Sequence, residues 1–271
     1  MFITGTDAAD AGASALVGDA ADETIEGLGG ADELFGNRGQ DRLLGGAGSD
    51  TLRGGSGADL LDGGADSDWA SYEDEAGGVQ VDLEATSVWN ARGQASTATG
   101  TDTITGVEYV RGSAHADTLV GDNSWGGLFG LGGDDTLSGR DANDKLEGGD
   151  GNDSLDGGNH DDTLVGGAGD DVLHGGGGTD RFTWTKRADG TYFDGEDVVK
   201  DFTPGAGGDY LRFVGTQDSS TWDTNGDRVI DDADAGAELV PDVGLRLFDA
   251  NGSVLIEGVA RVLKSELHFH L

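Results

Sequence analysis

The chain has 271 residues, with 53 Asp plus Glu against 16 Lys plus Arg, 52 Gly and no Cys. A net charge of −37 repels phosphate and anionic lipid, which excludes nucleic acid and acidic membranes as partners and favours cations. No apolar run approaches ~18 residues, and Met1 to Gly12 lacks a basic segment followed by an apolar one, so we expect neither a transmembrane segment nor a Sec-type leader.

Residues 1–71 are expected to form a first repeat block, because glycine and aspartate recur there every nine residues. From Gly27 the chain reads GLGGADELF, GNRGQDRLL, GGAGSDTLR, GGSGADLLD and GGADSDWAS, with a degenerate copy GDAADETIE before it. Each unit opens with a glycine-rich stretch, has Asp sixth and has an apolar residue, usually Leu, eighth. One apolar residue in nine cannot form the stripe of a helix, so we predict three-residue strands joined by six-residue glycine-rich turns.

Residues 72–111 break this period and are expected to form a non-repeat β spacer. Val79, Val81 and Leu83 alternate with polar residues, and further apolar residues follow between Ile104 and Val110. Both stretches are typical of strands, here around a polar loop at Asn90 to Thr101. We interpret the segment as an apolar cap, so that the chain contains either two rolls or one interrupted roll.

Residues 112–183 are expected to form a second repeat block of eight units. They read GSAHADTLV, GDNSWGGLF, GLGGDDTLS, GRDANDKLE, GGDGNDSLD, GGNHDDTLV, GGAGDDVLH and GGGGTDRFT. Three departures from the pattern weaken particular positions: Glu23 replaces the Asp of the first unit, Gly126 replaces an Asp in the second block, and Asp66 replaces a turn glycine.

Two units of turn and strand would complete one coil of a solenoid, whose thin core is filled by the Leu of opposite strands. Single coils bury too little apolar surface, so the coils must stack. Stacking brings the Asp of one unit above the Asp two units later, and a column of carboxylates roughly 4.8 Å apart is repulsive. A hard divalent cation between coils reverses this effect, and calcium, with six to eight oxygen ligands at flexible geometry, suits the site better than magnesium.

The units resemble the GGxGxDxUx nonapeptide of RTX (repeats-in-toxin) proteins, a calcium-binding repeat. The resemblance implies an all-β fold, a right-handed parallel β-roll (β-helix solenoid) in two repeat blocks with a β-rich C-terminal cap, and several calcium ions between turns. The alternative interpretation of the repeats is a low-complexity segment, rich in glycine and aspartate, that binds no metal. The implied metal ligands are Asp32, Asp41, Asp50, Asp59, Asp68, Asp117, Asp135, Asp144, Asp153, Asp162, Asp171 and Asp180.

Residues 184–271 differ in composition, with aromatic residues and longer apolar runs that can form a proper core. The segment Phe193 to Gly215 resembles the one that follows the repeats in serralysin-type proteases and other type I secretion substrates. We predict a β-rich continuation that caps the open end of the roll and shields its edge strands. The final GVARVLKSELHFHL resembles type I secretion signals, which makes the type I secretion machinery an expected partner.

Residues 223–234, DTNGDRVIDDAD, are similar to an EF-hand or dockerin calcium loop. Their oxygen side chains occupy positions 1, 3, 5, 9 and 12 of such a loop. Arg228 stands where the sharp turn prefers Gly, and the last carboxylate is that of Asp rather than Glu. The alternative is a solvated acidic turn. The candidate ligands here are Asp223, Asn225, Asp227, Asp231 and Asp234.

No catalytic motif is found in the sequence. None of the five histidines forms HExxH, and neither GxSxG nor GxxxxGK[ST] occurs. We therefore expect that the chain is not an enzyme and that any enzymatic domain would lie outside it.

The sequence favours a calcium-binding module of a secreted, extracellular bacterial protein, one that folds after type I secretion. Intracellular calcium is low, so the −37 chain would stay unfolded for export and fold outside. The alternative is a polysaccharide- or surface-binding module attached to a secreted enzyme, which calls for an exposed aromatic platform. The five tryptophans do not recur at one repeat position, which argues against such a platform. They are Trp69, Trp89, Trp125, Trp184 and Trp222.

Overall fold

The computed structural model describes residues 1–6, 8, 15–84, 87–90, 101–185, 188, 195–203, 208–214, 229–230, 237–240, 244–248, 253–257, 262–263 and 267–270. Every regular element in these ranges is a β-strand, which confirms the all-β fold class. None of them contains a helix long and apolar enough to cross a membrane. The chain divides into two compact units, Met1–Gly132 (unit 1) and Gly133–Leu271 (unit 2), which are described separately.

Unit 1 consists of two sheets, A and B, between which the chain alternates. Sheet A contains, in spatial order, β1 (Phe2–Thr4), β3 (Thr24–Gly29), β5 (Arg42–Ala47), β7 (Leu60–Ala65), β11 (Thr101–Thr105), β10 (Ser87–Asn90), β9 (Val79–Asp82) and β13 (Thr118–Val120). Sheet B contains β2 (Leu16–Val17), β4 (Glu33–Arg38), β6 (Thr51–Ser56), β8 (Trp69–Ser71), β12 (Tyr109–Arg111) and β14 (Gly127–Gly132).

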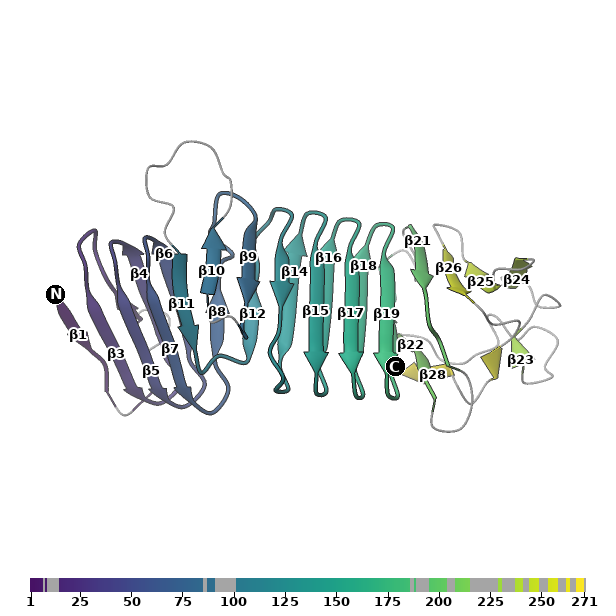
Figure 1. Ribbon diagram of the computed structural model, residues 1–271, viewed down its shortest axis with the longest axis horizontal. Helices are drawn as coiled ribbons and strands as arrows, with labels where there is room; N and C mark the ends of the chain where they lie inside the picture. The colour runs from purple at the N-terminus through teal and green to yellow at the C-terminus, as the bar shows by residue number, and fades with distance from the viewer. Residues whose placement is uncertain are drawn as a thin grey trace. The chain divides into compact units, whose positions relative to one another are not determined.

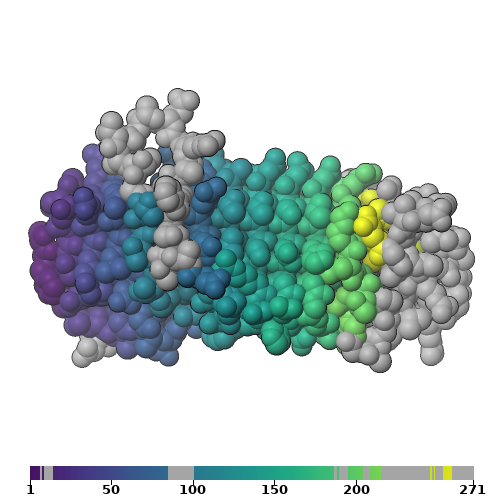
Figure 2. All heavy atoms as spheres, viewed as in Figure 1, coloured from purple at the N-terminus to yellow at the C-terminus, as the bar shows by residue number. Residues whose placement is uncertain are grey.

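Strands two repeats apart lie side by side and parallel, as Figure 1 shows for β3, β5 and β7. The register pairs Ile25 with Leu43 and Leu43 with Leu61. Each coil therefore contains two repeats, and the eighth-position side chains form a column between the two sheets. Ile25, Leu43 and Leu61 are fully buried. The expected β-solenoid is thus confirmed, and Figure 2 shows its coils as neighbouring bands.

Most of the repeat strands are longer than the three residues that the sequence predicted; β8 and β13 have that length. The longer strands run from the seventh position of one repeat to the third position of the next, as Arg42–Ala47 of β5 does, which leaves a corner of three residues. The second and fourth positions have left-handed backbone, with φ of 110° at Gly46 and 118° at Gly48. Glycine adopts this conformation at little steric cost, so the parallel pairing continues through the glycine-rich stretch that was taken for a turn.

The spacer contributes strands to both sheets of unit 1. Strand β11 pairs in parallel with β7, and β12 pairs in parallel with β8 and β14. Strand β10 is the exception, because it lies antiparallel between β9 and β11. The predicted strands at Val79 and Ile104 are present as β9 and β11. Of the predicted loop, residues 91–100 lie outside the described residues.

Unit 2 follows the same plan. Its sheet A contains β15 (Thr136–Asp141), β17 (Ser154–Asn159), β19 (Val172–Gly177), β21 (Glu196–Val199), β26 (Ser253–Glu257), β25 (Gly244–Phe248) and β24 (Ala237–Val240). Its sheet B contains β16 (Lys145–Asp150), β18 (Thr163–Ala168), β20 (Arg181–Thr185), β22 (Tyr210–Val214) and β28 (Leu267–His270). A separate antiparallel pair is formed by β23 (Val229–Ile230) and β27 (Val262–Leu263).

The strands after the last repeat extend both sheets of unit 2. Strands β21 and β26 continue sheet A, while β22 and β28 continue sheet B, all in parallel. Aromatic side chains fill the core here: the rings of Trp184 and Phe213 stack with centroids 5.6 Å apart, and those of Phe182 and Phe202 lie 6.2 Å apart. The larger side chains allow a thicker core than the single Leu of a repeat.

Burial of the eighth-position Leu predicts a sharp difference between two neighbouring residues of β19. Leu173 is fully buried, whereas Val172 is 37% exposed. We expect Leu173→Ala to lower the free energy of unfolding in calcium by about 2–5 kcal/mol, because it leaves a cavity in the thin core. Val172→Ala should lower it by about 0.5 kcal/mol. Denaturant unfolding measures both values, and equal losses would contradict the inward column.

Candidate metal centre

The acidic residues at the sixth repeat position are buried, although the chain has a large excess of negative charge. Asp50 and Asp171 are fully buried, and Asp144, the most exposed of the twelve predicted ligands, is 7% exposed. Each lies at the corner where one strand ends and the next begins. Buried carboxylates need hydrogen bonds or a cation to offset their lost hydration.

In nine of the twelve carboxylates, one oxygen accepts a hydrogen bond from a backbone N–H of the neighbouring coil. The N–H of Asp32 donates to Oδ1 of Asp50 at 2.8 Å, and the N–H of Asp50 donates to Oδ1 of Asp68 at 2.8 Å. In unit 2 the N–H of Asp135 donates to Oδ1 of Asp153, also at 2.8 Å. The predicted juxtaposition of aspartates two repeats apart is present within each unit, with a side chain of one meeting the backbone of the other.

These bonds form four ladders of acidic residues, two at the corners of each unit. In unit 1 the ladders are Glu23–Asp41–Asp59–Asp102 and Asp32–Asp50–Asp68–Glu108. In unit 2 they are Asp135–Asp153–Asp171–Asp197 and Asp144–Asp162–Asp180–Asp209. Asp117 does not belong to any of the four ladders. Its Oδ1 accepts a hydrogen bond from the N–H of Val79 at 2.7 Å.

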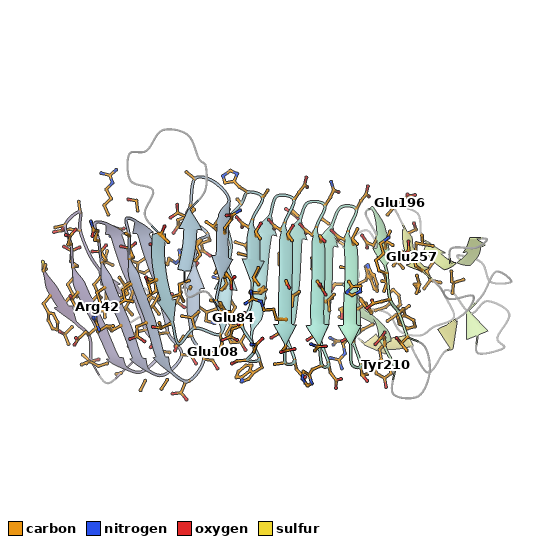
Figure 3. The ribbon with its side chains drawn as sticks, in the orientation of Figure 1. Arg42, Glu84, Glu108, Glu196, Tyr210 and Glu257 are labelled. Carbon is orange, nitrogen blue, oxygen red and sulfur yellow. The ribbon has the colours of Figure 1, made fainter. Side chains whose placement is uncertain are left out.

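Each ladder ends on an acidic residue that sequence reasoning missed. These four lie outside the period of nine. Figure 3 labels one of them, Glu108, which directly precedes β12. A signal was available, because each is followed two residues later by a buried apolar side chain, as in a repeat; Asp197 precedes Val199 and Asp209 precedes Leu211. The four residues are Asp102, Glu108, Asp197 and Asp209.

The second oxygens of the ladder carboxylates are not all satisfied by the protein. Several interior Oδ2 atoms are buried and have no hydrogen-bond partner among the described residues; they belong to Asp41, Asp50, Asp59, Asp68, Asp153 and Asp162. At two ends a protein donor occupies this position. The indole N–H of Trp184 donates to Oδ2 of Asp197, and the N–H of Thr203 donates to Oδ2 of Asp209, both at 2.7 Å.

The first-position glycines leave the space into which these oxygens point. A Cβ on Gly36 would lie 2.6 Å from Oδ2 of Asp41 and 2.5 Å from the carbonyl oxygen of Gly54 in the next coil. In unit 2, a Cβ on Gly157 would lie 2.5 Å from Oδ2 of Asp162 and 2.6 Å from the carbonyl oxygen of Gly175. A carboxylate and a carbonyl oxygen therefore converge where only glycine fits.

These donors fit a hard cation such as calcium, which takes carboxylate and carbonyl oxygens together. No group of three His, Cys, Asp or Glu side chains able to hold a metal occurs in the described part of the chain. The oxygens that converge at each corner come from carboxylates and from glycine carbonyls. A cation would also neutralise the buried charge that the backbone N–H groups satisfy only in part.

Burial raises the pKa of four aspartates in the interior of the ladders, because it removes the hydration of the charged form. The pKa is about 6 for Asp50 and Asp153 and about 7 for Asp68 and Asp162. The N–H donor from the adjacent coil lowers each pKa in part, and neighbouring carboxylates raise it further. Without a cation, the charged ladder is thus unfavourable near neutral pH.

The second predicted calcium site is not described by the structure. Asp223, Asn225, Asp227, Asp231 and Asp234 all lie outside the described residues. Within this loop only Val229 and Ile230 are described, as β23. The EF-hand-like loop stays a prediction.

Comparison with known proteins identifies the repeats. The RTX calcium-binding nonapeptide repeat family matches the chain in four copies, at residues 17–52, 35–70, 129–159 and 156–183. A search of curated proteins finds no match. Among solved structures, the extracellular lipase LipA from Serratia marcescens matches at 16% identity and a TM-score of 0.32, over 98% of this chain and 39% of the lipase chain. So low a score supports no conclusion about activity.

The ladder geometry predicts that Asp153 matters more for calcium than Asp156, three residues further on. Asp153 is buried and bonded to the coils on both sides, whereas Asp156 is exposed. Asp153→Asn should raise the calcium concentration at the folding midpoint roughly tenfold, because a charged oxygen donor is lost. Asp156→Asn removes the same charge and should shift the midpoint little. Calcium titrations followed by circular dichroism compare the two, and equal shifts would refute the ladder sites.

The raised pKa values predict that the calcium-free fold is favoured by acid. In the unfolded chain these carboxyls have pKa values near ~3.9, and in the fold they have values of about 6 to 7. The stability that these carboxyls contribute is fully present when the pH is below their pKa in the unfolded chain. It is lost as the pH rises through their pKa in the fold. Calcium-depleted protein should therefore lose β-structure between pH 5 and 8.

Circular dichroism of desalted protein measures this loss. About 0.5 M NaCl screens the repulsion between exposed charges and leaves the effect of the buried carboxyls. Calcium-depleted protein with more β-structure at pH 8 than at pH 5 would contradict the prediction.

Proposed function

The repeats of this chain are RTX calcium-binding nonapeptide repeats, and on that premise we propose that it is a calcium-dependent folding and stabilising module of an extracellular protein exported by type I secretion. RTX repeats fold on calcium binding in secreted proteins, and proteins that carry them are typically secreted. In this proposal the chain has no catalytic centre of its own, and an activity would belong to residues outside it.

The observation that carries the proposal is the set of buried Oδ2 atoms in the interior of the ladders. The coils place these acids in the core of the corners, where their charge costs free energy. Where calcium is scarce, this cost and the net charge of −37 keep the chain open. Where calcium is abundant, its binding energy becomes folding energy, because the sites exist only in the stacked coils.

The segment after Thr183 has two roles in the proposal, as a template for folding and as the export signal. Strand β19 pairs with β21, and β20 pairs with β22, so this segment supplies the next coil for the last repeats. It also supplies Asp197 and Asp209, which end the two ladders of unit 2. A first coil with a partner on only one side lacks half its stacking contacts, so a preformed core lowers the cost of starting the roll.

Truncation after Thr183 tests both roles. The full chain should gain β-structure when millimolar calcium replaces chelator, and equal magnesium should give much less because it demands a stricter geometry. The truncated chain should stay largely unfolded in millimolar calcium and should not be exported by cells that carry the secretion machinery. A truncated chain that folds with an unchanged calcium midpoint would show that the repeats nucleate their own folding. A full chain whose β-structure is the same in chelator would refute calcium-dependent folding itself.

A further inference from the structure

The fifth residue of each repeat, which directly precedes the buried Asp, forms further hydrogen bonds between the coils of unit 2. The N–H of Asn152 donates to Oδ1 of Asp134 at 2.9 Å, and the N–H of Asp170 donates to Oδ1 of Asn152 at 2.8 Å. At the other corner, the N–H of Asp161 donates to Oδ1 of Asn143 at 3.2 Å. These outer rows end with bonds at 2.8 Å from the N–H of Glu196 to Asp170 and from the N–H of Thr179 to Asp161.

The outer rows complement the acidic ladders, because their bonds lead in the opposite direction along the stack. The N–H of Asn152 donates to the coil before it, whereas the N–H of Asp153 donates to Asp171 in the coil after it. The N–H groups of Asp161 and Asp162 are divided in the same way. Two successive N–H groups therefore join one corner to both neighbouring coils.

The two kinds of bond differ in their need for a cation. The side chains that accept in the outer rows belong to exposed residues, such as Asn143, Asn152 and Asp161. They keep their hydration, so their hydrogen bonds form without the cost of a buried charge. The outer rows therefore stabilise the coils of unit 2 before any calcium is bound.

The repeats of unit 1 lack these rows. Among their described residues, only Gln40 has an N–H that donates to a side chain at the fifth position, that of Asp22, at 2.8 Å. Alanine offers no side-chain acceptor, and no hydrogen bond joins Ser49 to the N–H of Ser67 in this part of the chain. The fifth residues of these repeats are Ala31, Gln40, Ser49, Ala58 and Ser67.

The length of the side chain decides whether the outer bond forms. Gln40 has the same amide group as Asn152, on a side chain longer by one methylene. Asn152 accepts the N–H of Asp170, 18 residues later. No hydrogen bond joins Gln40 to Ala58, also 18 residues later, and both residues are described. None of Ala31, Ser49, Asn143 and Asn152 has left-handed backbone, so the same side chains fit at all four positions.

We infer that the fifth repeat position regulates the calcium sites, by setting the calcium concentration at which each unit folds, and that unit 2 folds at lower calcium than unit 1. This inference rests on the proposed calcium-dependent folding. Free energy from the outer rows is available without calcium, so less of the folding free energy of unit 2 has to come from ion binding. Unit 1 has the same buried ladder carboxylates without these rows. The chain therefore responds to rising calcium in two steps.

Amide hydrogen exchange of the full chain, measured by mass spectrometry at stepped calcium concentrations, follows the two units separately. Peptides from residues 24–65 report unit 1, and peptides from residues 136–185 report unit 2. Protection should appear in unit 2 at the lower calcium concentration. The segment after Thr183 favours the same order, so substitutions within each unit are needed to isolate the outer rows.

The double substitution Ala31→Asn and Ser49→Asn adds two outer bonds to unit 1, because it supplies acceptors for the N–H groups of residues 49 and 67. It should lower the calcium midpoint for protection of unit 1 roughly twofold and change that of unit 2 little. The matched control is Ala31→Gln with Ser49→Gln, which adds the same amide groups on longer side chains. It should leave both midpoints unchanged, as Gln40 forms no such bond to Ala58.

The converse substitution, Asn143→Ala with Asn152→Ala, removes the acceptors for Asp161 and Asp170. It should raise the calcium midpoint of unit 2 roughly twofold. All these changes are neutral, so long-range attraction for calcium stays the same. The inference is overturned if unit 1 is protected first, if the Asn and Gln pairs act alike, or if the alanine pair leaves unit 2 unchanged. An unchanged chain that gains no protection with calcium in either unit would instead contradict the proposed function.

Discussion

The rest of the structure depends on the burial of a carboxylate at the corners of the coil. The sixth-position Asp is buried there, and one of its oxygens accepts a hydrogen bond from a backbone N–H of the coil before it, as at Asp50 and Asp153. Within the repeats this bond joins residues 18 apart, which is one coil. It also leaves the other oxygen to a cation or to a specific protein donor, as Trp184 provides for Asp197.

The glycines of the repeat follow from the same constraint. At the first position no Cβ fits, because the carboxylate of the same repeat and a carbonyl of the next coil occupy that space, as at Gly36. At the second and fourth positions the backbone is left-handed, which glycine adopts without strain, as at Gly46 and Gly48. Where another residue stands there, such as Leu131 or Arg140, the coil imposes the same φ of 78°. The nine-residue pattern thus encodes corner geometry and ion chemistry together.

Much of the fold and of the ladders could be predicted from the sequence, because the repeat is strictly local. The inward Leu, the pairing two repeats apart and the identity of the eleven sixth-position aspartates in the ladders all follow from position within the unit. The sequence could not give the strand length, since glycine composition suggests a turn where the backbone of β5 in fact stays paired. It also missed Asp102 and Asp197, which meet Asp59 and Asp171 across 43 and 26 residues rather than 18. An insertion changes the sequence separation of two residues in contact, so the period of nine no longer predicts the contact, although the stacked coils still form it.

The central claim is that calcium occupies the corners where a buried carboxylate oxygen and a glycine carbonyl converge. Diffraction from crystals grown in calcium, recorded at a wavelength where calcium scatters anomalously, tests it directly. The account predicts anomalous peaks in rows along the ladders, beside Oδ2 of Asp41, Asp50, Asp153 and Asp162, and none beside Oδ2 of Asp197, which Trp184 occupies. Peaks confined to exposed acidic side chains, with the ladder oxygens free of metal, would contradict it.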